Sequence, residues 1–313
     1  MLPSKERWTA MNNDPSWADE APEVMRRRLR IALRQAREQL GLTQKEAATK
    51  LYWSVSKIIR IEQGVVPVTP TDVRALLSLY GVTDQQQVDV LINLALGSKK
   101  QPWDDYKEVY SQAALTLFGN ESAAKIISKY EPTYVPGLLQ IPEYAQALVK
   151  GLGRSDDEAE LMVTARVERQ ELLERDVRPE FDYIIDEGAV SRAVGNPSIM
   201  LRQFERIKEL GARPGISIHI LPFSAGAHRR MADAFTILQF GDELDDLLYL
   251  ENAGRETTTR DDQKLIAEYR NDFLDLEAMA SKSDDLGRVL DDIADLRFKG
   301  RTNVRAKDQG AVT

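Results

Sequence analysis

Residues 41–64, GLTQKEAATKLYWSVSKIIRIEQG, predict two short helices joined by a tight turn. Gly41 can end a preceding helix, because glycine adopts the left-handed C′ conformation without a steric penalty. Thr43 is a suitable N-cap, and Glu46 three residues later completes a capping box for a first helix over 44–51.

The turn at Tyr52 and Trp53 leads to Ser54, which is a suitable N-cap for a second helix over 55–63, and Gly64 ends that helix. The apolar residues of both helices repeat at helical spacing, so they predict one buried face: Ala47, Ala48, Leu51, Ile58 and Ile61.

The flanking sequence extends the same pattern in both directions. Residues 24–40 predict an amphipathic helix, and after Pro67 and Pro70 a further helix runs from residue 71 or 72 to Tyr80. The stripe of the first of these helices contains Met25, Leu29, Ala32, Leu33, Ala36 and Leu40.

Charge is unevenly distributed along the chain. Residues 24–64 contain ten basic and three acidic residues, a net charge of +7, although the whole chain carries −8, so the remainder carries −15. A basic segment attached to an acidic remainder is typical of nucleic-acid-binding proteins. The alternative explanation of the basic charge is a solvated, arginine-rich helix face.

These features resemble the phage-repressor-like (XRE-type) helix-turn-helix family. The matching residues are Gly41-Leu42-Thr43-Gln44-x-Glu46-x-Ala48 and Ser54-x-Ser56-Lys57-Ile58-x-Arg60-Ile61-Glu62-x-Gly64. One residue departs from the family pattern: Tyr52 stands where most members have glycine, so it must adopt a negative φ or tolerate strain.

The resemblance implies that the second helix of the motif enters the DNA major groove. By position, it makes Val55, Ser56 and Arg60 the candidate base contacts, and Gln44, Lys57 and Gln63 the candidate phosphate contacts. For Arg60 the alternative is a surface salt bridge with Glu62 or Glu46.

The rest of the chain predicts an α+β domain with a mostly antiparallel sheet. The candidate strands are 124–130, 181–185, 216–221, 235–240 and 247–251, of which the last two suggest a hairpin. Helical periodicity fits 141–152, 156–174, 197–211 and 261–279, and less clearly 284–296.

The fold class is therefore a mainly α helix-turn-helix domain followed by an α+β domain. The predicted divisions are a disordered N-terminal arm (1–22), the DNA-binding domain (23–97), a helical connector (98–119), an effector or dimerisation domain (120–282), and a C-terminal helix with a disordered tail (283–313).

A second resemblance covers most of the chain, about residues 24–280. The motifs at 134–145, 186–195, 220–228 and 249–251 are similar to actinobacterial regulators in which a helix-turn-helix precedes a large uncharacterised C-terminal domain. Such regulators are described as antitoxin-like or developmental, and their genes commonly neighbour one for a small partner protein.

Composition excludes several classes of function. The 313 residues include no cysteine and two histidines, which argues against disulfides, iron–sulfur clusters and metal sites, and no cofactor is expected. Adjacent carboxylates such as Asp186-Glu187 do not converge on one point, so an enzyme is not expected. The chain has neither an apolar run of about 20 residues nor a secretory leader, and a cytoplasmic protein without membrane contact is expected.

Two other segments of the body are candidate sites. The loop containing His228, Arg229 and Arg230 could hold an anionic effector or a partner carboxylate, although an incidental surface loop is the simpler interpretation. Residues 134–144 could line a pocket, although a corner of the core is favoured.

Together these features predict a DNA-binding transcriptional regulator, dimeric and repressor-like, that recognises a palindromic double-stranded operator. Its C-terminal domain is expected to dimerise, or to sense a small molecule or partner protein. The alternative is an antitoxin-like interaction protein that binds a small partner and contacts DNA only to regulate its own gene.

Overall fold

The computed structural model describes residues 22–63, 66, 68–97, 103–241, 245–252 and 255–299. The predicted disordered arm (except Pro22), the predicted disordered tail beyond Lys299, Gly64 and Pro67 lie outside these residues. The chain divides into two compact units, and the boundary along the sequence falls between Asp104 and Asp105.

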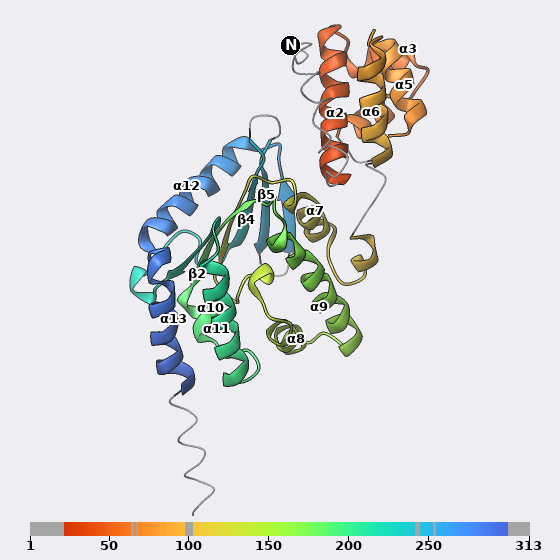
Figure 1. Ribbon diagram of the computed structural model, residues 1–313. Helices are drawn as coiled ribbons and strands as arrows, with labels where there is room; N and C mark the ends of the chain where they lie inside the picture. Colours follow the sequence, from red (N-terminus) through yellow and green to blue (C-terminus); the bar gives the residue numbers. More distant parts are fainter. Residues whose placement is uncertain are drawn as a thin grey trace, which may run out of the picture. The chain divides into compact units, whose positions relative to one another are not determined.

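The described residues of the first unit form five α-helices (Figure 1). They are α2 (Pro22–Gln39), α3 (Gln44–Lys50), α4 (Val55–Glu62), α5 (Pro70–Leu79) and α6 (Gln85–Gly97). The predicted apolar stripes form a single core that includes Leu33, Ala47, Ile58 and Ile61. The helix-turn-helix prediction is thereby confirmed as a fold. Leu40 was wrongly placed in the stripe: it follows the end of α2 and is 51% exposed.

The predicted caps of α3 and α4 are present. The Thr43 hydroxyl accepts a hydrogen bond from the backbone N–H of Glu46, and the Glu46 carboxylate accepts one from the backbone N–H of Thr43 at 2.8 Å. At α4 the Ser54 hydroxyl accepts from the backbone N–H of Lys57. These bonds satisfy amides that would otherwise have no partner at the helix ends.

Tyr52 occupies the left-handed position that ends α3. Its φ is +56°, its side chain is 97% exposed, and the backbone N–H groups of Tyr52 and Trp53 donate to the carbonyls of Thr49 and Ala48. This Schellman geometry recurs after α2, where Gly41 has a φ of +65°. Of the two alternatives for Tyr52, a negative φ or strain, the structure shows the strained, left-handed conformation.

We expect Tyr52→Gly to raise the free energy of unfolding of the first unit by about 0.5–1 kcal/mol. The left-handed conformation costs a non-glycine residue about 1–2 kcal/mol, and the added flexibility of glycine in the unfolded chain offsets part of the gain. Native-state hydrogen exchange in α3 and α4 measures the change, and Gly41→Ala should have the opposite sign. Equal or lower protection in Tyr52→Gly would contradict the assignment of strain.

The second unit contains a six-stranded mixed sheet with strand order β3-β2-β1-β4-β5-β6. Its strands are β1 (Ile126–Glu131), β2 (Glu180–Asp186), β3 (Ile216–Leu221), β4 (Ala234–Gln239), β5 (Leu247–Asn252) and β6 (Arg255–Thr259). The predicted hairpin is confirmed, because β4 pairs with β5 in antiparallel orientation.

The prediction of a mostly antiparallel sheet needs correction, because β1 pairs with β2, and β2 with β3, in parallel. The reason lies in the connections. The β1–β2 connection contains α8 (Pro142–Gly151) and α9 (Asp156–Gln170), and the β2–β3 connection contains α10 (Glu187–Ser191) and α11 (Pro197–Gly211). Helical crossovers return the chain to the same end of the sheet, so the next strand runs parallel.

Helices cover both faces of the sheet (Figure 1). On one face α12 (Gln263–Met279) packs on an apolar core that includes Tyr130, Phe235 and Ile237. The other face meets α7 (Gln112–Glu121), which begins within the segment predicted as a connector and packs on β5 and β6. The C-terminal helix α13 (Leu286–Ala294) packs on α11 and β3. Among the described residues, no helix is long and apolar enough to cross a membrane.

Candidate nucleic-acid interface

Helix α4 presents one polar face to solvent. Ile58 and Ile61 are buried in the core of the first unit, whereas Ser56, Arg60 and Gln63 are exposed at spacings of four and three residues. Val55 at the start of the helix is also exposed. The structure therefore places all three candidate base contacts on the accessible surface of the helix.

Arg60 has no hydrogen-bond or ion-pair partner within the part of the chain that the structure describes. Both carboxylates considered as alternative partners are engaged elsewhere. Glu46 accepts bonds from Thr43, and Glu62 accepts bonds from Arg37 and Gln44. The Arg60 guanidinium therefore keeps its donors available for a ligand.

A buried ion pair fixes α4 against α2. Nε and Nη2 of Arg37 donate to the two carboxylate oxygens of Glu62 at 2.6 and 2.9 Å, and Nη1 of Arg37 donates to the carbonyl of Leu42 at 2.6 Å. Gln44 Nε2 donates to Glu62 at 2.8 Å. The Gln44 side chain, predicted to contact phosphate, is thus held inside the unit and helps to position α4.

The other two predicted phosphate contacts differ in their availability. Lys57 Nζ lies 2.7 Å from an Asp72 carboxylate oxygen and 3.6 Å from the centre of the Trp53 ring, so it ties α4 to α5. Gln63 has an exposed side chain, and its backbone carbonyl accepts a hydrogen bond from Nη1 of Arg30 at 3.0 Å. Trp53 is partly buried and packs against the core of the unit.

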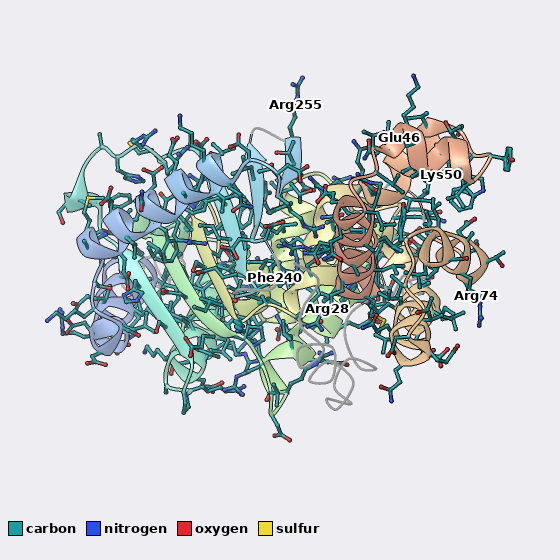
Figure 2. The ribbon with its side chains drawn as sticks, turned by 90° about the horizontal axis from the view of Figure 1, so that it is seen from above. Arg28, Glu46, Lys50, Arg74, Phe240 and Arg255 are labelled. Atoms are coloured by element: carbon teal, nitrogen blue, oxygen red, sulfur yellow. The ribbon has the colours of Figure 1, made fainter. Side chains whose placement is uncertain are left out.

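Further cations lie on the outside of the first unit. Figure 2 shows Lys50 on α3 and Arg74 on α5 at its surface. By contrast, Arg27 is buried and cannot face DNA directly. The basic charge of residues 24–64 is therefore divided between structural arginines and an exposed set around α3 and α4.

The loop proposed from sequence as an effector site is bound to α12. Arg229 and Arg230 both make ion pairs with Glu268 and Asp272, and Arg230 also stacks on Tyr269 with its guanidinium carbon 3.6 Å from the ring centre. The positive charge of this loop is therefore neutralised by neighbouring carboxylates. His228 Nε2 lies 3.3 Å from the hydroxyl of Tyr130.

One group of side chains in the second unit has a composition that could hold a metal ion. Among the described residues, Asp182, His219 and Glu277 bring their oxygen and nitrogen ligand atoms within 4.8 Å of one another. The Nδ1 of His219 lies 2.8 Å from the Ser281 carbonyl, which leaves Nε2 facing the two carboxylates. The small number of histidines argued against a metal site, and the sequence does not indicate this grouping, because the three residues come from β2, β3 and α12.

Burial, together with the neighbouring charge of Glu277, raises the pKa of Asp182 to about 6. Folding is therefore favoured by protonation, and this stabilisation is lost as pH rises from about 4 through 6. We expect Asp182→Asn to match the wild type near pH 4 and to exceed it by about 2–3 kcal/mol near pH 7.5, since one pKa unit corresponds to about 1.4 kcal/mol. Urea unfolding with a chelator present measures this difference. A difference that does not change with pH would contradict the expectation.

Comparison with known families agrees with the two-unit architecture. Residues 28–91 match the model of a helix-turn-helix domain, which is a DNA-binding module. Residues 115–292, more than half of the chain, match a domain of unknown function, DUF5753. The chain belongs to the DUF5753 family. No curated protein and no solved structure matches this DUF5753 protein.

Proposed function

We propose that this DUF5753 protein is a sequence-specific transcriptional regulator of the phage-repressor-like type. The observation that carries the proposal is the exposed face of α4, where Arg60 has no protein partner among the described residues and Val55 and Ser56 lie beside it. The family match to a helix-turn-helix domain supports the same function.

In this proposal the N-terminal part of α4 enters the major groove. Arg60 donates two hydrogen bonds to guanine, Ser56 bonds a neighbouring base edge, and Val55 contacts a thymine methyl group. Gln63 reaches the phosphate backbone. The position of α4 is fixed by two contacts: Gln44 bonds Glu62, and Lys57 bonds Asp72.

The second unit gives the regulator its dimeric form and its response to an effector. A repressor-like homodimer places two copies of α4 in successive major grooves, so its operator is palindromic with half-sites about 34 Å apart. The acidic charge outside the DNA-binding segment repels DNA and so weakens non-specific binding. The contacts of α4 then determine which DNA sequence is bound.

Selection of duplexes from a random pool by the full-length protein tests this function. We expect enrichment of a palindrome over competitor DNA, with an affinity that falls steeply as salt rises. Selection carried out at two stated salt concentrations separates base recognition from phosphate attraction. A pool that stays random at both concentrations would contradict the proposal.

A further inference from the structure

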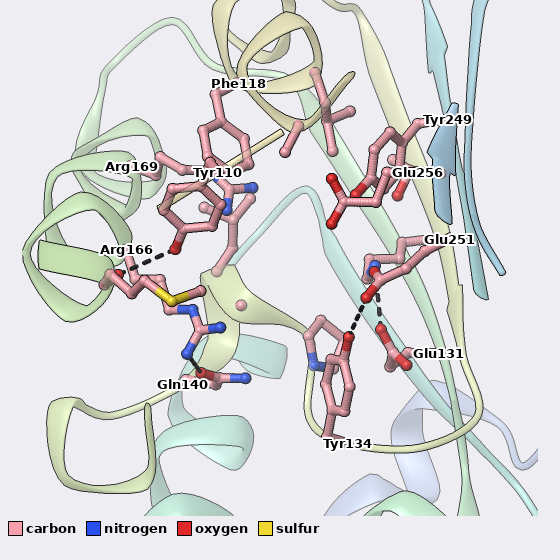
Figure 3. Close-up of a pocket in the computed structure, with 18 of the residues that line it drawn as sticks. Tyr110, Phe118, Glu131, Tyr134, Gln140, Arg166, Arg169, Tyr249, Glu251 and Glu256 are labelled. Atoms are coloured by element: carbon pink, nitrogen blue, oxygen red, sulfur yellow. Dashed lines mark hydrogen bonds and ion pairs between the residues drawn. The ribbon is translucent and has the colours of Figure 1, made fainter. Parts of the chain in front are cut away.

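The second unit contains a cavity of about 440 Å³ between the sheet and helices α7 and α9. This volume falls within the range of about 300–1,000 Å³ that is typical of small-molecule sites. Figure 3 shows Tyr249, Glu256, Glu251, Glu131 and Tyr134 along one wall, and Phe118, Tyr110, Arg169, Arg166 and Gln140 along the opposite wall. The 134–144 segment, for which a corner of the core was favoured, contributes Tyr134, Pro136, Gly137, Leu138 and Gln140 to the lining, whereas none of the other candidate site residues lines the cavity.

The register of the strands explains why this wall is polar. Tyr183, Lys129, Thr236 and Tyr249 are successive partners across β2, β1, β4 and β5, so their side chains share one face of the sheet. Two residues further along β1 and β5 lie Glu131 and Glu251, and Glu251 pairs with Glu256 on β6. The opposite face, under α12, contains an apolar core, and Asp182, His219 and Glu277 form a polar group on the same side of the sheet.

The carboxylates on this wall exceed the basic groups beside them. Glu131 is 0% exposed and pairs with Lys129 Nζ at 3.2 Å, while Glu251 accepts a bond from the Tyr134 hydroxyl at 2.6 Å and Glu256 accepts one from Ser111. Burial and the nearby charge of Glu251 raise the pKa of Glu131, although Lys129 opposes this shift. Three carboxylates with one ammonium group favour a cationic ligand.

The arginines of the opposite wall make their hydrogen bonds and ion pairs with residues other than these three carboxylates, and Arg154, for example, pairs with Glu158 at 3.1 Å. Arg169 forms a two-point ion pair with Glu121, at 3.1 and 2.6 Å, and stacks on the Phe118 ring. Arg166 donates to the amide oxygen of Gln140 at 3.0 Å. The cavity therefore has an acidic side at the sheet and, at α9, donors suited to a hydrogen-bond acceptor.

Two buried hydroxyl groups provide an independent sign of a ligand. Tyr183 is 1% exposed and Thr236 is 2% exposed; both line the cavity, and neither hydroxyl has a hydrogen-bond partner within the described part of the chain. A buried polar group without a partner is unfavourable, so natural proteins usually satisfy it. Both oxygens can accept hydrogen bonds from a ligand N–H group.

We propose that this cavity binds a small organic cation, a protonated primary amine with an aromatic or aliphatic body. The ammonium group bonds Glu131 and Glu251 and lies within reach of the Thr236 and Tyr183 hydroxyls, while the rings of Tyr134 and Tyr110 contact the cation and the body. This site belongs to the second unit and does not depend on DNA binding by the first.

Calorimetric titration of the full-length protein at pH 7 with three probes of similar shape tests the charge preference. Phenethylamine carries the cation, 2-phenylethanol is neutral, and 3-phenylpropionate is anionic. We expect saturable binding of phenethylamine in the millimolar range or tighter, and at least about tenfold weaker binding of the other two, because charge-assisted hydrogen bonds favour the ammonium group. No saturable binding of the amine up to about 10 mM, or binding as tight for the alcohol or the acid, would overturn the proposal.

Variants locate the binding site. We expect Glu251→Gln to weaken phenethylamine binding at least about tenfold and Thr236→Val to weaken it about threefold to tenfold, since each removes one acceptor. Glu205→Gln, on the exposed surface of α11, is the charge-matched control and should leave binding unchanged. Unchanged binding in both cavity variants would place the amine elsewhere and overturn the assignment. If Glu251→Gln does not fold, as judged by circular dichroism, the binding measured for Thr236→Val alone tests the location of the site.

Discussion

Glu62→Ala should destabilise the helix-turn-helix by about 3–5 kcal/mol, because it leaves the buried Arg37 guanidinium with only the half-exposed Glu38 carboxylate, 3.4 Å from Nη2. The change also removes the acceptor of Gln44, so α3 and α4 both lose a contact that fixes their relative position. Native-state hydrogen exchange of the α3 and α4 amides in the full-length protein reports the loss separately from the second unit.

Two further variants show whether an uncompensated charge causes this loss. Arg34→Ala removes an exposed pair with Glu38 and should cost no more than about 0.5 kcal/mol. The double variant Arg37→Met, Glu62→Leu removes both charges and should recover much of the stability, since apolar replacements of a buried pair are often tolerated. A Glu62→Ala protein as protected as Arg34→Ala would contradict the role of the ion pair.

Asp272→Ala should destabilise the second unit by about 3 kcal/mol or more. Asp272 accepts from Nε of Arg230 at 2.7 Å and from Nη1 of Arg229 at 3.2 Å, and both Asp272 and Arg230 are buried. Loss of the carboxylate leaves Arg230 with the more exposed Glu268 as a partner, so the loop that contains His228 separates from α12. Hydrogen exchange in β4 and α12 measures the change.

Arg229→Ala is the matched control for this prediction. Its side chain is 67% exposed, and exposed ion pairs contribute about 0–1 kcal/mol. If Arg229→Ala and Asp272→Ala lose equal protection, the buried Arg230–Asp272 pair does not hold the loop. A full loss confined to Asp272→Ala would show that the buried pair of Arg230 with Asp272 stabilises the fold.

The sequence contained most of the information for the first unit. The caps at Thr43 and Ser54 and the apolar spacing of Ala47, Ile58 and Ile61 act over a few residues, so they can be recognised locally. The Arg37–Glu62 pair joins residues 25 positions apart, and nothing in their spacing indicates that they meet. The partners of Gln44 and Lys57 were missed for the same reason.

The sheet of the second unit shows where local reasoning fails. The helices predicted between the first three strands are long enough for crossovers, but the prediction of a mostly antiparallel sheet did not use them. The residues of β6, RETTT, are too polar to be recognised as a strand. The cavity depends on cross-strand register, which aligns Lys129 with Thr236 and Tyr183. Tyr134 belongs to a segment that the sequence offered as a possible pocket, whereas Glu251 appeared only in a family motif, and their contact is visible only in three dimensions.

Footprinting of the wild-type protein and of Arg60→Ala on a selected operator tests the central claim, that the exposed face of α4 reads DNA sequence. We expect Arg60→Ala to lose about 1–3 kcal/mol of specific binding, or about fivefold to 150-fold in affinity, and to relax the preference at one base pair per half-site. Arg202→Ala, which removes the same charge from the second unit, should leave the footprint intact. An unchanged footprint and unchanged base preference in Arg60→Ala would contradict the account.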